Sequence, residues 1–88
     1  MFRIEYHKQV FKDLDKIPDD YVEKIVEEIR ALACNPFPSG YKKLSGKFNA
    51  YRIRIGDYRI IYIVDLHGNK IRIMRARHRK DIYQNLNF

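Results

Sequence analysis

Residues 50–77 constrain the fold most, because they contain three runs of alternating apolar and polar side chains with short breaks between them. The runs cover about residues 50–56, 57–65 and 70–77. An alternation with a period of two is typical of strands that bury one face. Gly56-Asp57 leaves room only for a tight turn, and the segment DLHGNK is typical of a second hairpin. We therefore predict three neighbouring strands of an antiparallel sheet.

The preceding part of the chain predicts one strand, two helices and a loop. MFRIEY alternates in the same way and indicates a strand. Residues 7–17 and a longer stretch from Asp19 to Asn35 have apolar side chains at helical spacing, with Pro18 between them. Residues 35–50 are rich in turn formers. The predicted order is β-α-α-β-β-β, an α+β domain with an N-terminal helical hairpin packed on one face of the sheet.

The length and composition indicate a single domain, residues 1–88, because 88 residues leave no room for two cores. The one cysteine, Cys34, excludes an internal disulfide and fits a reducing compartment. The first residues do not resemble a signal peptide, and no apolar run approaches the length of a membrane span. We expect a small cytoplasmic protein that does not interact with a membrane.

The charge is distributed unevenly along the chain. Residues 1–40 contain six Lys and Arg against eight Asp and Glu, a balance of −2, whereas residues 41–88 contain twelve against three, a balance of +9. Such asymmetry within one domain indicates a face that binds a polyanion, either a nucleic acid or an acidic protein. A basic surface without a specific partner is the alternative.

The basic half places arginines at the polar positions of its strands. Arg52 and Arg54 share one face of the first run, Arg59 lies in the second, and the last run carries three more (Arg72, Arg75 and Arg77). Because the helical hairpin covers one face of the sheet, we expect the other face to carry the arginines. Guanidinium groups stay charged and bind phosphate oxygens in bidentate fashion. The pattern therefore predicts an anion-binding surface.

Three segments taken together resemble a known family. The strand pair YRIRIGDYRIIY, the upstream KKLSG and the tail RHRKDIY resemble the RelE/ParE superfamily of toxin–antitoxin toxins, and specifically its RelE-like branch. The resemblance runs nearly the full chain and implies a compact α+β fold related to microbial ribonucleases. RelE-like toxins are small basic endoribonucleases that cut mRNA in the ribosomal A site. An acidic antitoxin encoded beside them holds them inactive.

The resemblance implies the partners of this chain as well. They are an acidic antitoxin, the ribosome with its rRNA, and mRNA. The free toxin is expected to be a monomer, and the complex with the antitoxin to be a larger assembly. No cofactor and no metal is expected, because His7 and His67 lie far from each other and from any cluster of carboxylates in the sequence.

The resemblance also implies the catalytic residues, which are Arg52, Arg54, Arg59, Arg77 and Tyr83. In the best-known members the first pair is often lysine, whereas here both are arginine. Metal-free cleavage uses the ribose 2′-OH as nucleophile and needs a base, positive charge for the developing phosphorane, and an acid. We expect Arg59 and Arg77 to stabilise the phosphorane. Arg52 and Arg54 are assigned to phosphate positioning, since arginine does not deprotonate in proteins.

The proton-transfer group is left open between two residues. Tyrosine is a slow base, but neighbouring guanidinium groups would favour the phenolate of Tyr83. His78 is of the residue type that exchanges protons near neutral pH, and base stacking or a structural role is its alternative. Further cationic residues are predicted to bind RNA: Lys42, Lys43, Lys47, Arg72, Arg75, Arg79 and Lys80.

Two other functions fit the same features. A ParE-like toxin has the same fold but inhibits DNA gyrase by binding, without RNA chemistry. A non-catalytic RNA-binding module would bind RNA with a strong salt dependence and leave it uncut. A tyrosine within a set of arginines favours the ribonuclease, because a protein that only binds has no need of that tyrosine.

Overall fold

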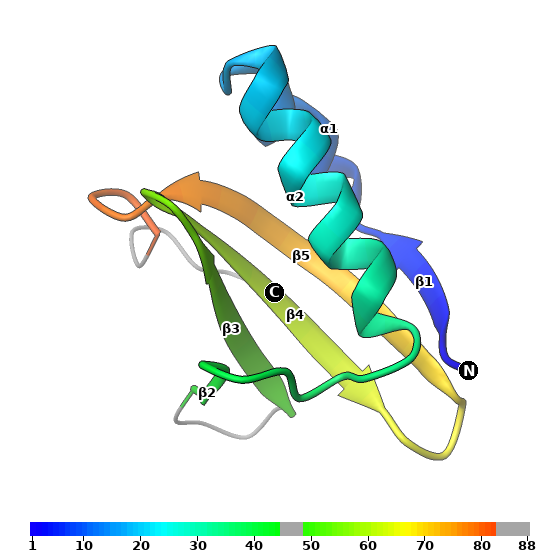
Figure 1. The fold of residues 1–88 in the computed structure, drawn as a ribbon. Coiled ribbons are helices and arrows are strands. Elements are labelled where there is room, and N and C mark those ends of the chain that lie inside the picture. The colour runs from blue at the N-terminus through cyan, green and yellow to red at the C-terminus, as the bar shows by residue number, and fades with distance from the viewer. Residues whose placement is uncertain (45–48, 83–88) are drawn as a thin grey trace.

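The computed structural model describes residues 1–44 and 49–82, in which two helices lie on one face of a five-stranded sheet (Figure 1). The sheet order is β1-β5-β4-β3-β2. The elements are β1 (Arg3–Tyr6), α1 (Lys8–Asp15), α2 (Asp19–Leu32), β2 (Lys42–Lys43), β3 (Ala50–Ile55), β4 (Tyr58–Asp65) and β5 (Lys70–His78). The α+β class and the helical hairpin on one face are confirmed.

The sheet differs from the prediction in two details. β1 pairs with β5 in parallel, from Arg3 opposite Lys70 to Tyr6 opposite Ile73, so the sheet is mixed and not antiparallel throughout. Short connections join β3, β4 and β5 and force an antiparallel direction, whereas both helices and three strands separate β1 from β5 in the chain. A short strand, β2, also forms within the segment predicted as a loop, and it pairs with residues 51–52 of β3.

The main core lies between the helices and the sheet. One stripe of each helix is apolar and buried, as the helical spacing predicts. The helix side contributes Val10, Ile17, Ile25, Ile29 and Leu32, and the strands contribute Ile53, Ile55, Ile60, Tyr62, Val64, Ile71, Ile73 and Ala76. Tyr62 is fully buried and donates a hydrogen bond to the carbonyl of Pro36 at 2.7 Å. Neither of the described helices is long and apolar enough to cross a membrane.

A smaller apolar cluster lies on the opposite face of the sheet. Ile61 of β4, Met74 of β5 and Ile82 are buried together, and Leu44 and Ile63 pack against them. After β5, the chain therefore folds back over this face, and the buried side chain of Ile82 packs against it. This face is thus not purely polar, and its arginines lie beside a second small core.

Candidate active site

Three arginines form a row across neighbouring strands. Arg54 of β3 is the direct cross-strand partner of Arg59 of β4, and Arg59 is the direct partner of Arg77 of β5. All three lie on the face of the sheet opposite the helices, since their strand neighbours Ile55, Tyr58 and Ala76 pack in the helix-side core. Like charges directly opposite each other destabilise a sheet. Guanidinium groups placed side by side in this way can bind one anion together.

A β-bulge places Arg77 in this row. Ile61 pairs with Arg75 while Tyr62 pairs with Ile73, so Met74 is an extra residue on β5. Strict alternation would have put Arg77 on the same face as Ile73, towards the helices. The bulge reverses the alternation and turns Arg77 towards Arg59.

Asp13 of α1 forms hydrogen bonds to the two residues of β5 that follow Met74 at the bulge. Its carboxylate accepts hydrogen bonds from Nε and Nη2 of Arg75, both at 2.8 Å, and from the backbone N–H of Ala76 at 3.0 Å. Asp13 is 6% exposed, and the side chain of Arg75 is 15% exposed. The hydrogen bonds to Asp13, together with its negative charge, raise the pKa of the Arg75 guanidinium above its usual value. Asp13 is not among the residues predicted from the sequence, although a carboxylate three residues after the core residue Val10, on the apolar face of a helix, is a signal that could have indicated it.

The turn between β3 and β4 connects to the row through backbone contacts. Nη1 of Arg59 donates to the carbonyls of Gly56 at 2.9 Å and of Tyr58 at 3.0 Å. Gly56 has a φ of +59°, and a Cβ there would come within 2.8 Å of the Tyr21 ring. Both facts require glycine at this position. The predicted tight turn at Gly56-Asp57 is confirmed, and it brings Arg54 opposite Arg59.

The segment after β5 packs against the same turn. The backbone N–H of Arg79 donates to the carbonyl of Asp57 at 2.8 Å, and their side chains form an exposed ion pair at 3.9 Å. Nη1 of Arg77 donates to the carbonyl of Asp81 at 3.1 Å. Arg77, the third arginine of the row, is thus hydrogen-bonded to the segment that leads to Ile82 of the small apolar cluster.

Arg52 lies on the same face as the row but is buried. It is 7% exposed, and its Nε has no hydrogen-bond partner within residues 1–44 and 49–82. Arg52, Arg54 and Lys42 line a cavity of about 420 Å³ at the edge of β3. A buried donor without a partner costs roughly 1–3 kcal/mol, and more when it is charged. Arg52 and Arg54 share one face of β3, as their spacing predicts, but they differ in exposure: Arg52 lies between Lys42 of β2 and Ile61 of β4, whereas Arg54 is exposed.

His78 lies on the helix side of the sheet, whereas Arg77 lies on the opposite side. Its cross-strand partner is Tyr58, and the two rings meet edge to face with centroids 5.6 Å apart. Nδ1 of His78 accepts a hydrogen bond from the backbone N–H of Lys80 at 3.2 Å. A neutral imidazole therefore carries its proton on Nε2. His78 and Arg77 nonetheless line one cavity, at the end of β5.

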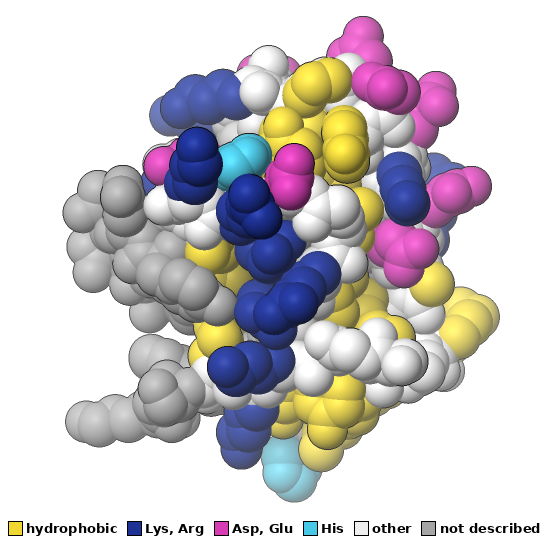
Figure 2. Space-filling view, turned by 60° about the vertical axis from the view of Figure 1, so that its left-hand side comes forward, with side chains coloured by type: hydrophobic (Ala, Val, Ile, Leu, Met, Phe, Trp, Pro, Cys, Tyr) yellow, Lys and Arg dark blue, Asp and Glu magenta, His cyan; other side chains and the backbone are white. Residues whose placement is uncertain are grey.

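The cationic residues predicted to bind RNA are spread over several places. Five of them are exposed, on β2, on β5 and after β5: Lys42, Lys43, Arg72, Arg79 and Lys80. Arg75 is different, because Asp13 already balances its charge. Tyr83 and Lys47 lie outside the described residues. Figure 2 shows Lys and Arg side chains gathered in a band on one face, with most of the acidic side chains at the top and right of the view. No group of His, Cys, Asp and Glu suited to a metal ion occurs within the described ranges.

The comparisons with known proteins identify the family. Residues 4–83 match the model of the ParE toxin of the type II toxin–antitoxin system parDE. A protein of Methanocaldococcus jannaschii that carries the toxin name RelE1 is 37% identical over 87 residues, which is 96% of this chain and 97% of the relative. The chain belongs to the RelE/ParE family of type II toxins.

Solved structures of the RelE/ParE family share the fold. The RelE chain in the archaeal RelE–RelB complex of Pyrococcus horikoshii is similar with a TM-score of 0.79 and 34% identity, over 89% of this chain and 94% of that one. The RelB–RelE antitoxin–toxin complex of Methanococcus jannaschii is similar with a TM-score of 0.74 and 32% identity, over 94% of this chain and 99% of that one. The resemblance drawn from YRIRIGDYRIIY and the tail is thereby confirmed at the level of family and fold.

Proposed function

We propose that this toxin is a ribosome-dependent endoribonuclease that cleaves mRNA in the A site without a metal ion. The observation that carries the proposal is the row Arg54–Arg59–Arg77, three guanidinium side chains on adjacent strands. Preorganised positive charge stabilises the charge that develops on a phosphorane, and removing one such donor from an active site typically costs a factor of about 10²–10³ in rate. The resemblance to RelE-like toxins supports the same reaction.

The proposed reaction is attack of the ribose 2′-OH on the adjacent phosphorus, with departure of the 5′-oxygen. The row would bind the non-bridging oxygens, since arginine forms bidentate bonds with phosphate. Arg52 fits a role in positioning the phosphate, because its buried Nε has no partner and its side chain lines a cavity together with Arg54. An anion there would satisfy the buried donor.

The proton-transfer group is proposed to be Tyr83 or His78. Tyr83 follows directly after Ile82, whose side chain is anchored on the arginine face of the sheet. His78 approaches from the other face, through the cavity that it shares with Arg77. Its Nε2 is the nitrogen that could exchange a proton with a substrate, because Nδ1 accepts a backbone hydrogen bond.

The partner proposed to inhibit the toxin is an acidic antitoxin. Two solved relatives are complexes of RelE with RelB, by their descriptions. A net charge of +7 favours an acidic partner. Added antitoxin should abolish cleavage. Full cleavage by a saturated complex would contradict this.

The test adds purified protein to programmed ribosomes and maps the new mRNA 5′ ends. Wild type should cut within the A-site codon, Arg77→Ala should cut far more slowly, and Tyr83→Phe and His78→Gln should show which residue transfers the proton. Lys24→Ala, on the exposed side of α2, is the matched control. Uncut mRNA with wild type would refute the proposal.

A second function is supported by the family model itself, whose description names the ParE toxin of parDE. Inhibition of DNA gyrase is therefore measured in parallel as loss of supercoiling. Supercoiling blocked while mRNA stays intact would assign the chain to the gyrase-binding branch. RNA binding without either effect would assign it to a non-catalytic module.

A further inference from the structure

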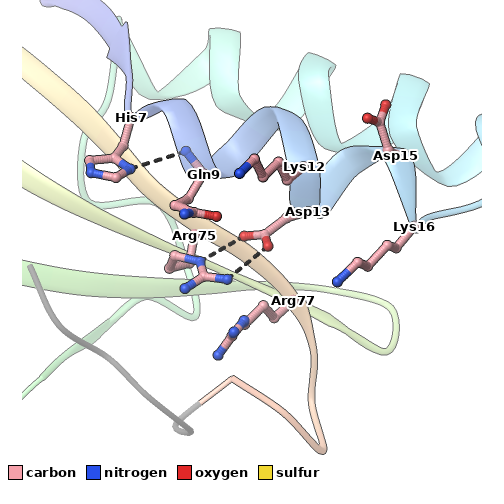
Figure 3. A pocket seen from close by; sticks show the side chains of 8 residues that line it. All are labelled: His7, Gln9, Lys12, Asp13, Asp15, Lys16, Arg75 and Arg77. Atoms are coloured by element: carbon pink, nitrogen blue, oxygen red, sulfur yellow. Dashed lines mark hydrogen bonds and ion pairs between the residues drawn. The ribbon is translucent and has the colours of Figure 1, made fainter.

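A groove runs between α1 and the part of β5 that β1 leaves uncovered. β1 pairs with β5 only up to Ile73, whereas β5 continues to His78. Two adjoining hollows of about 680 and 420 Å³ lie along this stretch and share Asp13, Lys16 and Arg77. Figure 3 shows α1 above this stretch of β5, with side chains reaching into the space from both elements. We call this feature the α1–β5 groove.

The floor of the α1–β5 groove is held in place by the Asp13–Arg75 pair. The two bonds of this ion pair and the third bond, from the N–H of Ala76, engage both oxygens of the carboxylate. Asp13 therefore neither repels an anion strongly nor competes for the lysines nearby. A groove whose floor is fixed, and whose buried carboxylate is already paired with a guanidinium, can bind a ligand with little reorganisation.

The charge that remains in the groove is positive. Lys12 lies in the last turn of α1, and Lys16 is the residue that caps its C-terminal end, four positions later. Both line the same hollow. No ion pair joins either ammonium group to a carboxylate of the described residues. Asp15 points away from Arg75 and Arg77 (Figure 3). Lys12 and Lys16 thus present two ammonium groups along one channel, whose lining also includes Arg77 and the carboxylate of Asp81.

The groove is continuous with the candidate active site. Arg77 lines both hollows and is also the last member of the arginine row. The second hollow is lined by Tyr58 and His78 as well, an aromatic pair, and by the carboxylate of Asp81. Aromatic side chains stack on bases, and carboxylates accept hydrogen bonds from base amino groups.

We propose that the α1–β5 groove binds the single-stranded RNA that adjoins the scissile phosphate, with Lys12 and Lys16 contacting its phosphates and the second hollow receiving a base. This inference rests on the proposed function, since it places the scissile phosphate at the arginine row. An acidic peptide fits the groove less well. The carboxylates of such a peptide would repel that of Asp81, whereas the amino group of a base can donate a hydrogen bond to Asp81.

The test measures binding of a short 2′-O-methyl RNA by fluorescence anisotropy as a function of salt. This strand has no free 2′-OH, so binding is measured apart from cleavage. Lys12→Ala/Lys16→Ala should weaken binding roughly tenfold at low salt and reduce the salt slope by about 1.4, for two lost contacts with a single strand. Lys24→Ala/Arg30→Ala removes the same charge from exposed positions of α2 that do not line the groove, and should bind like wild type.

Several outcomes would overturn the inference. They are equal losses in the two double variants, no loss in Lys12→Ala/Lys16→Ala, or no binding by wild type. A loss of affinity for a glutamate-rich peptide with RNA binding unchanged would also overturn it and make the groove a protein-binding surface. If the groove variant loses RNA binding but wild type never cuts mRNA on ribosomes, the groove stands and the proposed function fails.

Discussion

Arg59 of β4 and Arg77 of β5 lie directly opposite each other, although the alternation of β5 by itself would turn Arg77 towards the helices. An extra residue at Met74 reverses the alternation, and Asp13 of α1 holds the backbone at that point. β-Bulges are known to re-aim side chains next to active sites. The candidate site of this toxin therefore depends on a helix that contributes no residue to the arginine row.

Arg59→Ala should lower mRNA cleavage by a factor of about 10²–10³, because it removes the central charge of the row. Arg59→Lys should recover only part of the rate, since lysine keeps the charge but lacks the planar fork. Single-turnover cleavage on programmed ribosomes measures both variants. Arg30→Ala, on the exposed side of α2, serves as control. Equal rates for the lysine and wild-type proteins would argue against bidentate phosphate binding.

Arg52→Met should separate stability from activity. The substitution removes a buried Nε that has no partner among the described residues and retains a side chain of similar shape. We expect the free energy of unfolding to stay constant or to rise by about 1 kcal/mol, while cleavage falls at least tenfold. Urea denaturation and the cleavage assay measure the two effects. A clear loss of stability would show that Arg52 is bonded in the folded protein.

Asp13→Asn should lower the free energy of unfolding by roughly 3 kcal/mol, because it leaves Arg75 largely buried without its counter-charge. Cleavage should fall as well, as the bulge that presents Arg77 loosens. Asp15→Asn is the matched control: this carboxylate is exposed, so its removal should change stability by no more than about 0.5 kcal/mol. Similar effects of the two substitutions would contradict the role given to Asp13.

Gly56→Ala should destabilise the protein by about 1–2 kcal/mol from the left-handed backbone alone, and further through contact with Tyr21. Gly40→Ala separates the two causes. Gly40 also has a positive φ, of +88°, but nothing lies within 4 Å of its Cβ position. Thermal unfolding of both variants should show the larger loss for Gly56→Ala. The reverse order would exclude the close approach to Tyr21 as a cause.

Tyr62→Phe should change how stability depends on pH. Burial raises the pKa of the Tyr62 phenol, and the neighbouring Tyr51 and Tyr41 act in the same direction. A raised pKa means that the folded state keeps the proton, so this contribution is complete below about pH 10, where a free tyrosine titrates, and is lost as the pH rises above it. The variant should be about 1 kcal/mol less stable at pH 8, through loss of the bond to Pro36. Urea denaturation between pH 8 and 11 should show that this difference shrinks at the upper end.

The local elements of the fold could be predicted from particular residues. Ile53 and Ile55 alternate with Arg54, and Val10, Ile25 and Ile29 are spaced as on buried helix faces. Such periods depend only on local backbone geometry. The turn at Gly56-Asp57 follows from the same kind of information, because glycine permits the positive φ that the turn requires. The pairing of Arg54 with Arg59 then follows directly.

The sequence by itself determined the helical hairpin, three antiparallel strands, the pairing of Arg54 with Arg59 and the basic second half. Only the tertiary structure decided that Arg77 completes the row, that Arg52 is buried, that His78 faces the helices and that β1 lies parallel to β5. The physical reason is that these features depend on contacts between residues far apart in the chain. Arg75 at the bulge is bonded to Asp13, which lies 62 residues earlier in the chain. Neither the periodicity nor the composition of the sequence shows that these two residues meet.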